Sequence, residues 1–356
     1  MSRFHDLEIA ELVRETADAV SLRFAVPAQL ADSYRYAQGQ HLVVEAKIGG
    51  EAVRRTYSIC AGEDERELRI AIRRIAEGRF SAFANEALKV GDKLAVMPPA
   101  GSFHAELVPD QARLHLAIAA GSGITPILGI VKTVLAREPK SRVVLIYGNR
   151  SVDTILFREA LEDLKNRYMT RLALHHVLSR EAQDAEILQG HIDAAKLQAM
   201  AGALFRPEEV DTAYLCGPAG MIDAAQATLV ALGVPAERIH SERFHVDGTA
   251  ARAATAAAGP KREGEAEITV RLDGLTRRFA MPFDGAAIVD AGNEQGLNLP
   301  FSCKGGMCST CRAKLVEGKV DMRLNYALTP KEVAGGYVLT CQSHPVSERV
   351  VLDYDV

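Results

Sequence analysis

The sequence predicts a multidomain protein that contains an antiparallel β-barrel, a doubly wound α/β sheet and a small β-rich domain, in that order. Residues 5–104 form short runs of alternating apolar and polar residues, broken by glycine and proline, which is typical of an antiparallel barrel. From Leu114 onward, apolar runs alternate with helix-like stretches at intervals of about 30 residues, which is typical of a parallel sheet. A stretch rich in alanine, glycine and charge then separates the last part of the chain.

Length and composition limit the possible functions. The chain has 356 residues, 48% hydrophobic and 25% charged, so it is long enough for two or three domains of roughly 150 residues. Its net charge of -4 gives no broad basic surface, and we exclude nucleic-acid binding. The first residues lack the apolar core of a signal peptide, and no run of about 18 apolar residues occurs. We therefore expect a cytoplasmic protein without a membrane role.

The predicted boundaries follow from these patterns. We assign the barrel to residues 1–107 and the doubly wound sheet to residues 108–248, whose candidate strands are "LHLAIAAG", "SRVVLIYG", "RLALHHVLS" and "TAYLCGP". Residues 249–264 lack a periodic apolar face and are predicted to be a linker. The third domain, residues 265–356, begins with two alternating runs around Asp273 and Gly274, which is the pattern of a β-hairpin.

Four of the six cysteines form one constellation in the third domain. "CKGGMCSTC" supplies Cys303, Cys308 and Cys311, and Cys341 follows further along. Because cytoplasmic thiols stay reduced, such a cluster is expected to bind metal or to do redox chemistry. The spacing C-x4-C-x2-C with a distant fourth cysteine is that of plant-type [2Fe-2S] ferredoxins. Structural zinc, which usually takes paired CxxC motifs, and a metal-free loop are the alternatives.

Two glycine-containing motifs point to a nucleotide site in the doubly wound sheet. "AAGSGITP" follows a strand-like run and precedes a helix-like one, so a pyrophosphate can approach the backbone and the helix N-terminus. Gly-x-Gly alone is also compatible with a plain tight turn. "YLCGPAGM" ends another predicted strand at Cys216, where the edge of an open sheet faces the same crevice.

A third motif, "RRTYSI", lies in the predicted barrel. Arg55 offers a forked donor for phosphate, Tyr57 offers an aromatic plane, and Ser58 offers a hydroxyl for a polar ring. Taken singly, each residue also has a purely structural interpretation, as a surface ion pair, a core tyrosine or a turn serine.

In this order, the motifs resemble those of the ferredoxin-NADP reductase family, over the first 246 residues, joined to a plant-type ferredoxin over the last 92 or so. The resemblance implies an FAD-binding barrel, an NADP-binding α/β domain and a β-grasp ferredoxin domain. Reductase components that supply oxygenases have the same domain order. The family motifs here are Arg-x-Tyr-Ser, Gly-x-Gly-x-Thr-Pro and Cys-Gly-Pro.

The resemblance assigns roles to individual residues. It implies that Arg55 holds the flavin pyrophosphate, that Tyr57 stacks on the flavin, and that Ser58 reaches its N5 edge. Catalysis would involve Ser58, Cys216, Glu242 and Phe244, although Phe244 also suits a core position. The flavin phosphates would meet a helix start at Gly78, Phe80 and Ser81, where Ser81 is alternatively a simple N-cap. Further dinucleotide contacts are implied for Gly121, Gly123, Thr125, Cys216, Gly217 and Pro218. Cys60 has no assigned role and suits a buried position.

The choice of coenzyme depends on residues beyond the strand ends. A ribose 2'-phosphate favours arginine, whereas a free 2'-hydroxyl favours an acid. Arg150 lies in a suitable place, and the resemblance puts Ser179 and Arg180 on the 2'-phosphate, so we expect NADPH. Glu181 is the rival feature, since its carboxylate suits the free ribose of NADH.

The function implied is transfer of electrons from NADPH through FAD and a [2Fe-2S] cluster to the separate oxygenase component of a multicomponent monooxygenase. A di-iron epoxidase is the first candidate for that partner. A Rieske ring dioxygenase or another di-iron hydroxylase is an alternative, because nothing in the chain binds the organic substrate. A non-catalytic assembly subunit with vestigial cofactor sites is the second alternative.

Overall fold

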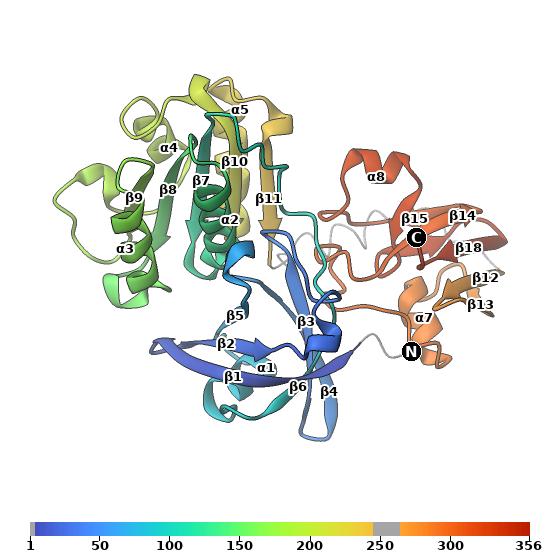
Figure 1. Ribbon diagram of the computed structural model, residues 1–356. Helices are drawn as coiled ribbons and strands as arrows, with labels where there is room; N and C mark the ends of the chain where they lie inside the picture. The colour runs from blue at the N-terminus through green and yellow to red at the C-terminus, as the bar shows by residue number, and fades with distance from the viewer. Residues whose placement is uncertain (1–3, 245–263) are drawn as a thin grey trace. The chain divides into compact units, whose positions relative to one another are not determined.

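The computed structural model describes residues 4–244 and 264–356, which form two compact units (Figure 1). The predicted linker, residues 249–264, lies outside the described residues except for Gly264. Within the described ranges, no helix is both long and apolar enough to cross a membrane.

The first unit begins with a six-stranded antiparallel sheet in the order β4-β3-β6-β1-β2-β5. A bridge between Ile59 and Ile70 joins its two edges, so the sheet closes into the predicted barrel. Alternate side chains of the strands, such as Leu22 and Leu42, fill the interior, as strand periodicity requires. The elements are β1 (His5–Thr16), β2 (Ala19–Ala25), β3 (His41–Ile48), β4 (Glu51–Ser58), β5 (Leu68–Arg73), α1 (Arg79–Glu86) and β6 (Lys93–Val96).

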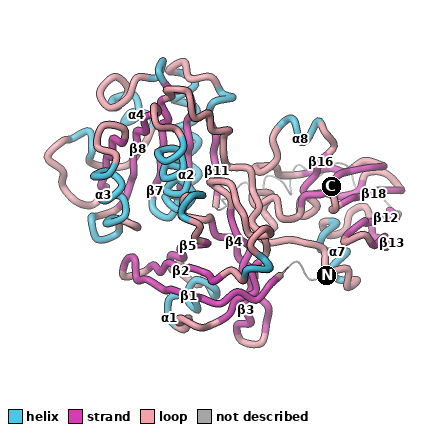
Figure 2. Tube along the Cα trace, viewed as in Figure 1, coloured by secondary structure: helices cyan, strands magenta, loops and turns pink. Residues whose placement is uncertain are grey.

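The same unit continues into a five-stranded parallel sheet in the order β11-β10-β7-β8-β9 (Figure 2). Its central strands are mostly apolar because both faces are covered, by α2 and α3 on one side and by α4 and α5 on the other. The elements are β7 (Leu114–Ala120), α2 (Ile124–Arg137), β8 (Arg142–Asn149), α3 (Arg158–Arg167), β9 (Leu172–Leu178), α4 (Ala194–Met200), β10 (Val210–Gly217), α5 (Ala219–Ala231) and β11 (Ile239–Arg243). The strand order reverses between β7 and β10, and ligands bind at such a switch point.

The second unit is a five-stranded mixed sheet in the order β13-β12-β18-β14-β16, with a two-stranded sheet of β15 and β17. The predicted hairpin turn is present: Asp273 and Gly274 have φ of 53° and 72°, as a two-residue turn that matches strand twist requires. The elements are β12 (Glu265–Leu272), β13 (Leu275–Pro282), α7 (Ile288–Glu294), β14 (Arg312–Glu317), β15 (Val320–Met322), α8 (Pro330–Ala334), β16 (Tyr337–Leu339), β17 (Ser343–Pro345) and β18 (Arg349–Asp353). The fold class predicted from the sequence is therefore confirmed.

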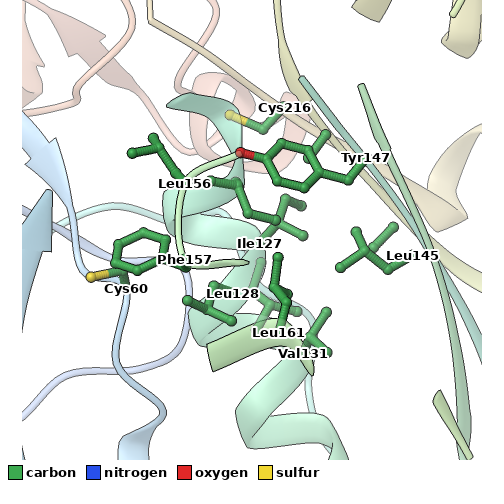
Figure 3. Packing of buried hydrophobic residues seen from close by; sticks show 14 of the residues in the cluster. Cys60, Ile127, Leu128, Val131, Leu145, Tyr147, Leu156, Phe157, Leu161 and Cys216 are labelled. Carbon is green, nitrogen blue, oxygen red and sulfur yellow. The ribbon is translucent and has the colours of Figure 1, made fainter. Parts of the chain in front are cut away.

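Helix α2 lies so close to two other backbone segments that only glycine fits at the contacts. A Cβ on Gly123 would lie 2.1 Å from the Cys216 carbonyl oxygen in β10. A Cβ on Gly129 would lie 2.9 Å from the Ala61 oxygen and 3.0 Å from the Ile59 oxygen, just beyond β4. The helix therefore packs closely against both the parallel sheet and the barrel. Figure 3 shows the core on its sheet side, where Ile127, Leu128 and Val131 pack with Leu145 and Tyr147.

A buried carboxylate stabilises the segment that connects the barrel to the parallel sheet. The side chain of Glu138, just after α2, is 0% exposed, forms an ion pair with Arg113 and accepts hydrogen bonds from the Val108 amide at 2.8 Å and the Ser141 hydroxyl at 2.7 Å. His115 Nε2 lies 2.8 Å from Glu138 Oε2, the oxygen that also accepts from Ser141. Burial raises the pKa of Glu138, but these bonds outweigh burial and lower that pKa to about 2.

Substitution of the α2 glycines tests the close contacts. We expect Gly123→Ala and Gly129→Ala each to destabilise the first unit by on the order of 1 to 3 kcal/mol, because the added methyl forces backbone apart. The measurement is urea unfolding followed by flavin fluorescence and circular dichroism. Gly220→Ala in α5 is the matched control: nothing lies within 4 Å of its Cβ position, so stability should hold or rise by up to about 1 kcal/mol. Equal stability of the Gly123 and Gly220 variants would refute the argument.

The pKa of Glu138 predicts how stability depends on pH. A folded pKa of about 2, below the ordinary 4.5, gives stability that is fully present above pH 4.5 and is lost as the pH falls toward 2. Glu138→Gln should lower the free energy of unfolding at neutral pH by about 3 to 5 kcal/mol, because it leaves Arg113 without its buried partner. It should also flatten the loss between pH 4.5 and 2. Glu208→Gln, at an exposed carboxylate of the same unit, should keep the wild-type slope; an unchanged slope in Glu138→Gln contradicts the assignment.

Candidate functional site

The turn between β7 and α2 has the geometry of an anion site. Gly121 adopts φ of 53°, a conformation that favours glycine, and the Tyr147 hydroxyl donates to its carbonyl at 2.9 Å. The Thr125 hydroxyl donates to the Ser122 carbonyl at 3.0 Å, so it closes the turn. No acidic residue lies in the first turn of α2. A glycine turn that leads into a helix start without an acid suits a pyrophosphate. Sequence analysis missed Tyr147, because nothing in the pattern distinguishes it from other core tyrosines.

Three predicted catalytic residues, from three strands, come together at the switch point. The Ser58 hydroxyl, at the end of β4, donates to Glu242 Oε2 at 3.1 Å. Glu242 in β11 lies opposite Cys216 in β10 in the parallel register. Burial raises the pKa of the fully buried Cys216 thiol, and the Glu242 carboxylate raises it further, so the thiol stays neutral. Phe244 packs against the core cluster that contains Cys216.

His41 belongs to the same cluster and was not predicted. It lies on β3 opposite Ser58, its side chain is 3% exposed, and its Nδ1 is 3.9 Å from Glu242 Oε1. Only the register of β3 against β4 reveals this proximity, so the sequence pattern carried no signal for it.

The residues of "RRTYSI" that are expected to contact flavin differ in their exposure. Arg55 is exposed on β4, and its Nη1 donates to the Arg54 carbonyl at 2.6 Å, which leaves the rest of its fork at the surface. Tyr57 is partly buried against Phe80, with ring centroids 5.7 Å apart and planes at 42°. Burial raises the pKa of Tyr57, so the phenol stays neutral. Phe80 is 0% exposed and supports Tyr57 from the core.

The start of α1 forms a pocket of about 420 Å³ lined by Asp18, Arg74, Ile75, Ala76, Glu77, Gly78, Arg79 and Ala82. The Ser81 hydroxyl accepts from the Ile75 amide at 3.2 Å and donates to the Gly78 carbonyl at 3.0 Å. It therefore holds the preceding turn and does not cap the helix, contrary to the N-cap alternative. A Cβ on Gly78 would lie 2.4 Å from that hydroxyl oxygen. The pocket opens beside a helix start with no acid in its first turn, which suits phosphate.

The residues expected at the ribose 2'-phosphate lie on adjacent loops. The Ser179 amide donates to the Asn149 carbonyl at 3.0 Å, and the Arg180 amide donates to the Arg150 carbonyl at 2.8 Å. Both arginines are exposed at the carboxyl edge of the sheet. The Glu181 carboxylate accepts a hydrogen bond from the Val152 amide at 2.9 Å.

The four predicted cluster cysteines are arranged in two pairs. Cys308 lies beside Cys303, whose amide donates to Cys308 Sγ at 3.5 Å, and the interaction of the two thiols lowers the pKa of Cys303 to about 6. The interaction of Cys311 with Cys341 raises the pKa of Cys311 and lowers that of Cys341. A two-iron cluster with four thiolate ligands needs two thiolates for each iron, so each pair would serve one iron. Within residues 4–244 and 264–356, no three histidine, cysteine or acidic side chains converge on one metal ion, so the thiols are arranged as pairs and not as a site for a single ion.

Backbone amides surround the cysteine sulfurs. The Gly305 and Met307 amides donate to Cys303 Sγ, each at 3.4 Å. Gly306 adopts φ of 73°, whereas Gly305 does not have positive φ; Lys304 and Ser309 do, at 49° and 47°. The loop residues with positive φ are therefore Lys304, Gly306 and Ser309, and only one of the two adjacent glycines is among them. Amides directed at sulfur favour a charged cluster.

Three family models match the chain in the predicted order. The "Oxidoreductase FAD-binding domain" matches residues 6–105, the "Oxidoreductase NAD-binding domain" matches residues 117–227, and the "2Fe-2S iron-sulfur cluster binding domain" matches residues 270–346. The last range contains all four paired cysteines, which favours the iron–sulfur interpretation over zinc. The domain boundaries set at residues 107, 248 and 265 stay predictions.

Relatives and solved structures agree with these matches. The chain is 44% identical to a subunit of the 1,2-phenylacetyl-CoA epoxidase of Escherichia coli strain K12, over 100% of this chain and 99% of that protein. It is 37% identical to the ferredoxin reductase component of 3-ketosteroid-9-alpha-monooxygenase from Mycolicibacterium smegmatis, over 98% and 97%. Phthalate dioxygenase reductase shares the fold, with a TM-score of 0.57 at 23% identity over 98% of both chains. The FAD/NAD-binding domain of Vibrio cholerae nitric oxide dioxygenase matches 67% of this chain and 98% of its own, with a TM-score of 0.58 and 28% identity.

Proposed function

The chain belongs to the family of flavin and iron–sulfur reductase components of oxygenases, and we propose that it carries electrons from NADPH through FAD and a [2Fe-2S] cluster to a phenylacetyl-CoA 1,2-epoxidase, a di-iron enzyme of phenylacetate degradation. The 44% identity to an epoxidase subunit over the whole chain carries this proposal. When bound, FAD accepts a hydride as two electrons, and the cluster carries electrons singly. The thiol chemistry of the cluster is consistent with a cytoplasmic location.

The residues at the switch point would hold the reacting rings. The Ser58 hydroxyl donates its one hydrogen to Glu242 Oε2 at 3.1 Å, and it would turn that hydrogen to the flavin edge when flavin binds. Cys216 presents a neutral, buried side chain, which keeps water and competing charge away from the nicotinamide. Phe244 packs beside it and would cover the site.

The remaining assigned residues bind and orient. Arg55 would pair with the flavin pyrophosphate, and Tyr57, supported by Phe80, would stack on the flavin. The helix start at Gly78, with its turn held by Ser81, would face the flavin phosphates. The dinucleotide would lie over the two strand ends that meet at Gly123, held by Gly121, Gly123, Thr125, Cys216, Gly217 and Pro218. The thiolates of Cys303, Cys308, Cys311 and Cys341 would bind the cluster.

NADPH is the coenzyme that we propose. Arg150, Ser179 and Arg180 lie together and suit a 2'-phosphate. Glu181 has its carboxylate engaged by the Val152 amide, which makes it a weaker ligand for the free ribose of NADH.

A different oxygenase partner is the second candidate. The 37% identity to a ketosteroid monooxygenase component over nearly the whole chain favours it, because the electron-transfer parts are the same and the organic substrate binds elsewhere. A non-catalytic assembly role has no comparable support.

The decisive experiment couples the purified protein to candidate oxygenases. With the epoxidase and phenylacetyl-CoA, we expect NADPH consumption to match epoxide formation, whereas a ketosteroid monooxygenase should couple poorly. Cys308→Ser, shown to contain normal flavin, should keep NADPH-dependent ferricyanide reduction, because that small acceptor meets the flavin directly. It should lose most cytochrome c reduction and all oxygenase turnover. Wild-type turnover by Cys308→Ser would remove the cluster from the electron path.

Coenzyme choice is tested at Arg180. Arg180→Ala should raise the KM for NADPH by the equivalent of about 1.5 to 3 kcal/mol, because it removes a charged hydrogen bond, and should leave the KM for NADH nearly unchanged. Arg206→Ala, at an exposed arginine of the same unit, is the control and should alter neither value. An equal rise for both coenzymes would exclude Arg180 from the 2'-phosphate site.

A further inference from the structure

Gln342 joins the two cysteine pairs. Its side-chain nitrogen donates to the Lys304 carbonyl at 2.8 Å and contacts Cys341 Sγ at 3.8 Å. Lys304 follows Cys303 directly, so one bond reaches the loop of the first pair and the other reaches a sulfur of the second. A carboxamide nitrogen carries two hydrogens, and both acceptors can therefore be served at once.

The backbone around Gln342 holds this side chain in place. Its own amide donates to the Leu339 carbonyl at 2.9 Å, and its carbonyl accepts from the Arg323 amide at 3.0 Å. A Cβ on Gly306 would lie 3.3 Å from the Gln342 Cγ and 2.8 Å from the Leu324 carbonyl oxygen. The cysteine loop therefore lies close to the Gln342 stem, and the two contacts of the carboxamide nitrogen hold it beside Lys304 and Cys341.

We propose that Gln342 is a positioning residue that sets the separation of the two cysteine pairs and tunes the reduction potential of the cluster through its hydrogen bond to Cys341. This inference rests on the proposed four-cysteine ligand set. The reduced cluster carries one more negative charge than the oxidised cluster, so a donor at a ligand sulfur stabilises the reduced form more. Hydrogen bonds to the sulfurs are among the factors that set these potentials.

The test measures the potential in the full-length holoprotein by spectroelectrochemical titration with mediators. Gln342→Met keeps the length of the side chain and removes the donor. We expect the one-electron equilibrium to shift about two- to tenfold toward the oxidised cluster, which corresponds to a fall of about 18 to 59 mV. Iron release to a chelator should also become faster, because the loop loses its bond at Lys304.

Gln295→Met is the matched control. The Gln295 carboxamide donates at 3.1 Å to the Ala280 carbonyl in β13, so its loss removes a comparable bond outside the cysteine loop and should leave the potential unchanged. A wild-type potential in Gln342→Met would overturn the proposal. If that variant does not retain iron, Gln342→Leu, which also lacks the donor and adds no charge, carries the same comparison. If the wild-type protein itself gives no [2Fe-2S] spectrum after reconstitution, the ligand set fails and this inference with it, whereas an intact spectrum confines any failure to Gln342.

Discussion

The arrangement of the first unit depends on the close backbone contacts of helix α2. At Gly123 the start of the helix contacts the carbonyl of Cys216. Further along the helix, Gly129 contacts the segment just after Ser58. A side chain larger than hydrogen at either position would separate the helix from β10 or from the barrel. Since both contacts involve backbone, neither neighbour can yield by changing a rotamer. One rigid helix therefore sets the distance between the strand that ends at Ser58 and the strand that contains Cys216.

The contact of Ser58 with Glu242, beside Cys216, is a consequence of that spacing. Ser58, Cys216 and Glu242 come from β4, β10 and β11, and no two of them are neighbours in sequence. Charged pairs at the far end of α2 reinforce the contact, since Arg137 and Lys132 pair with acids in the barrel loop after β4. Those pairs are partly exposed and contribute modestly. The buried contacts of the glycines set the geometry, and the ion pairs favour the same docking.

Local patterns predicted the elements whose causes are local. The hairpin at Asp273, the strand runs and the cysteine spacing each depend on nearby residues, and the structure and the family matches support them. Features that depend on tertiary packing gave no signal: Glu138 has the pattern of a surface acid near a helix end, yet it is buried among partners from three segments. The cysteine loop is a related case. Its two glycines permit a turn, but the surrounding loop decides which residue takes positive φ, and Lys304 does so while Gly305 does not.

The two redox sites differ in exposure in the way that their chemistry requires. The Cys216 thiol is fully buried, and hydride transfer benefits from a site that excludes water. Of the four cluster cysteines, only Cys303 is partly exposed, and its neighbour Lys304 lies at the surface, where a protein partner that takes single electrons can approach. The core around the cluster cysteines is built entirely from residues 266–354. A change beside the cysteines, such as one at Gln342, therefore acts on the packing of that core and on the proposed cluster.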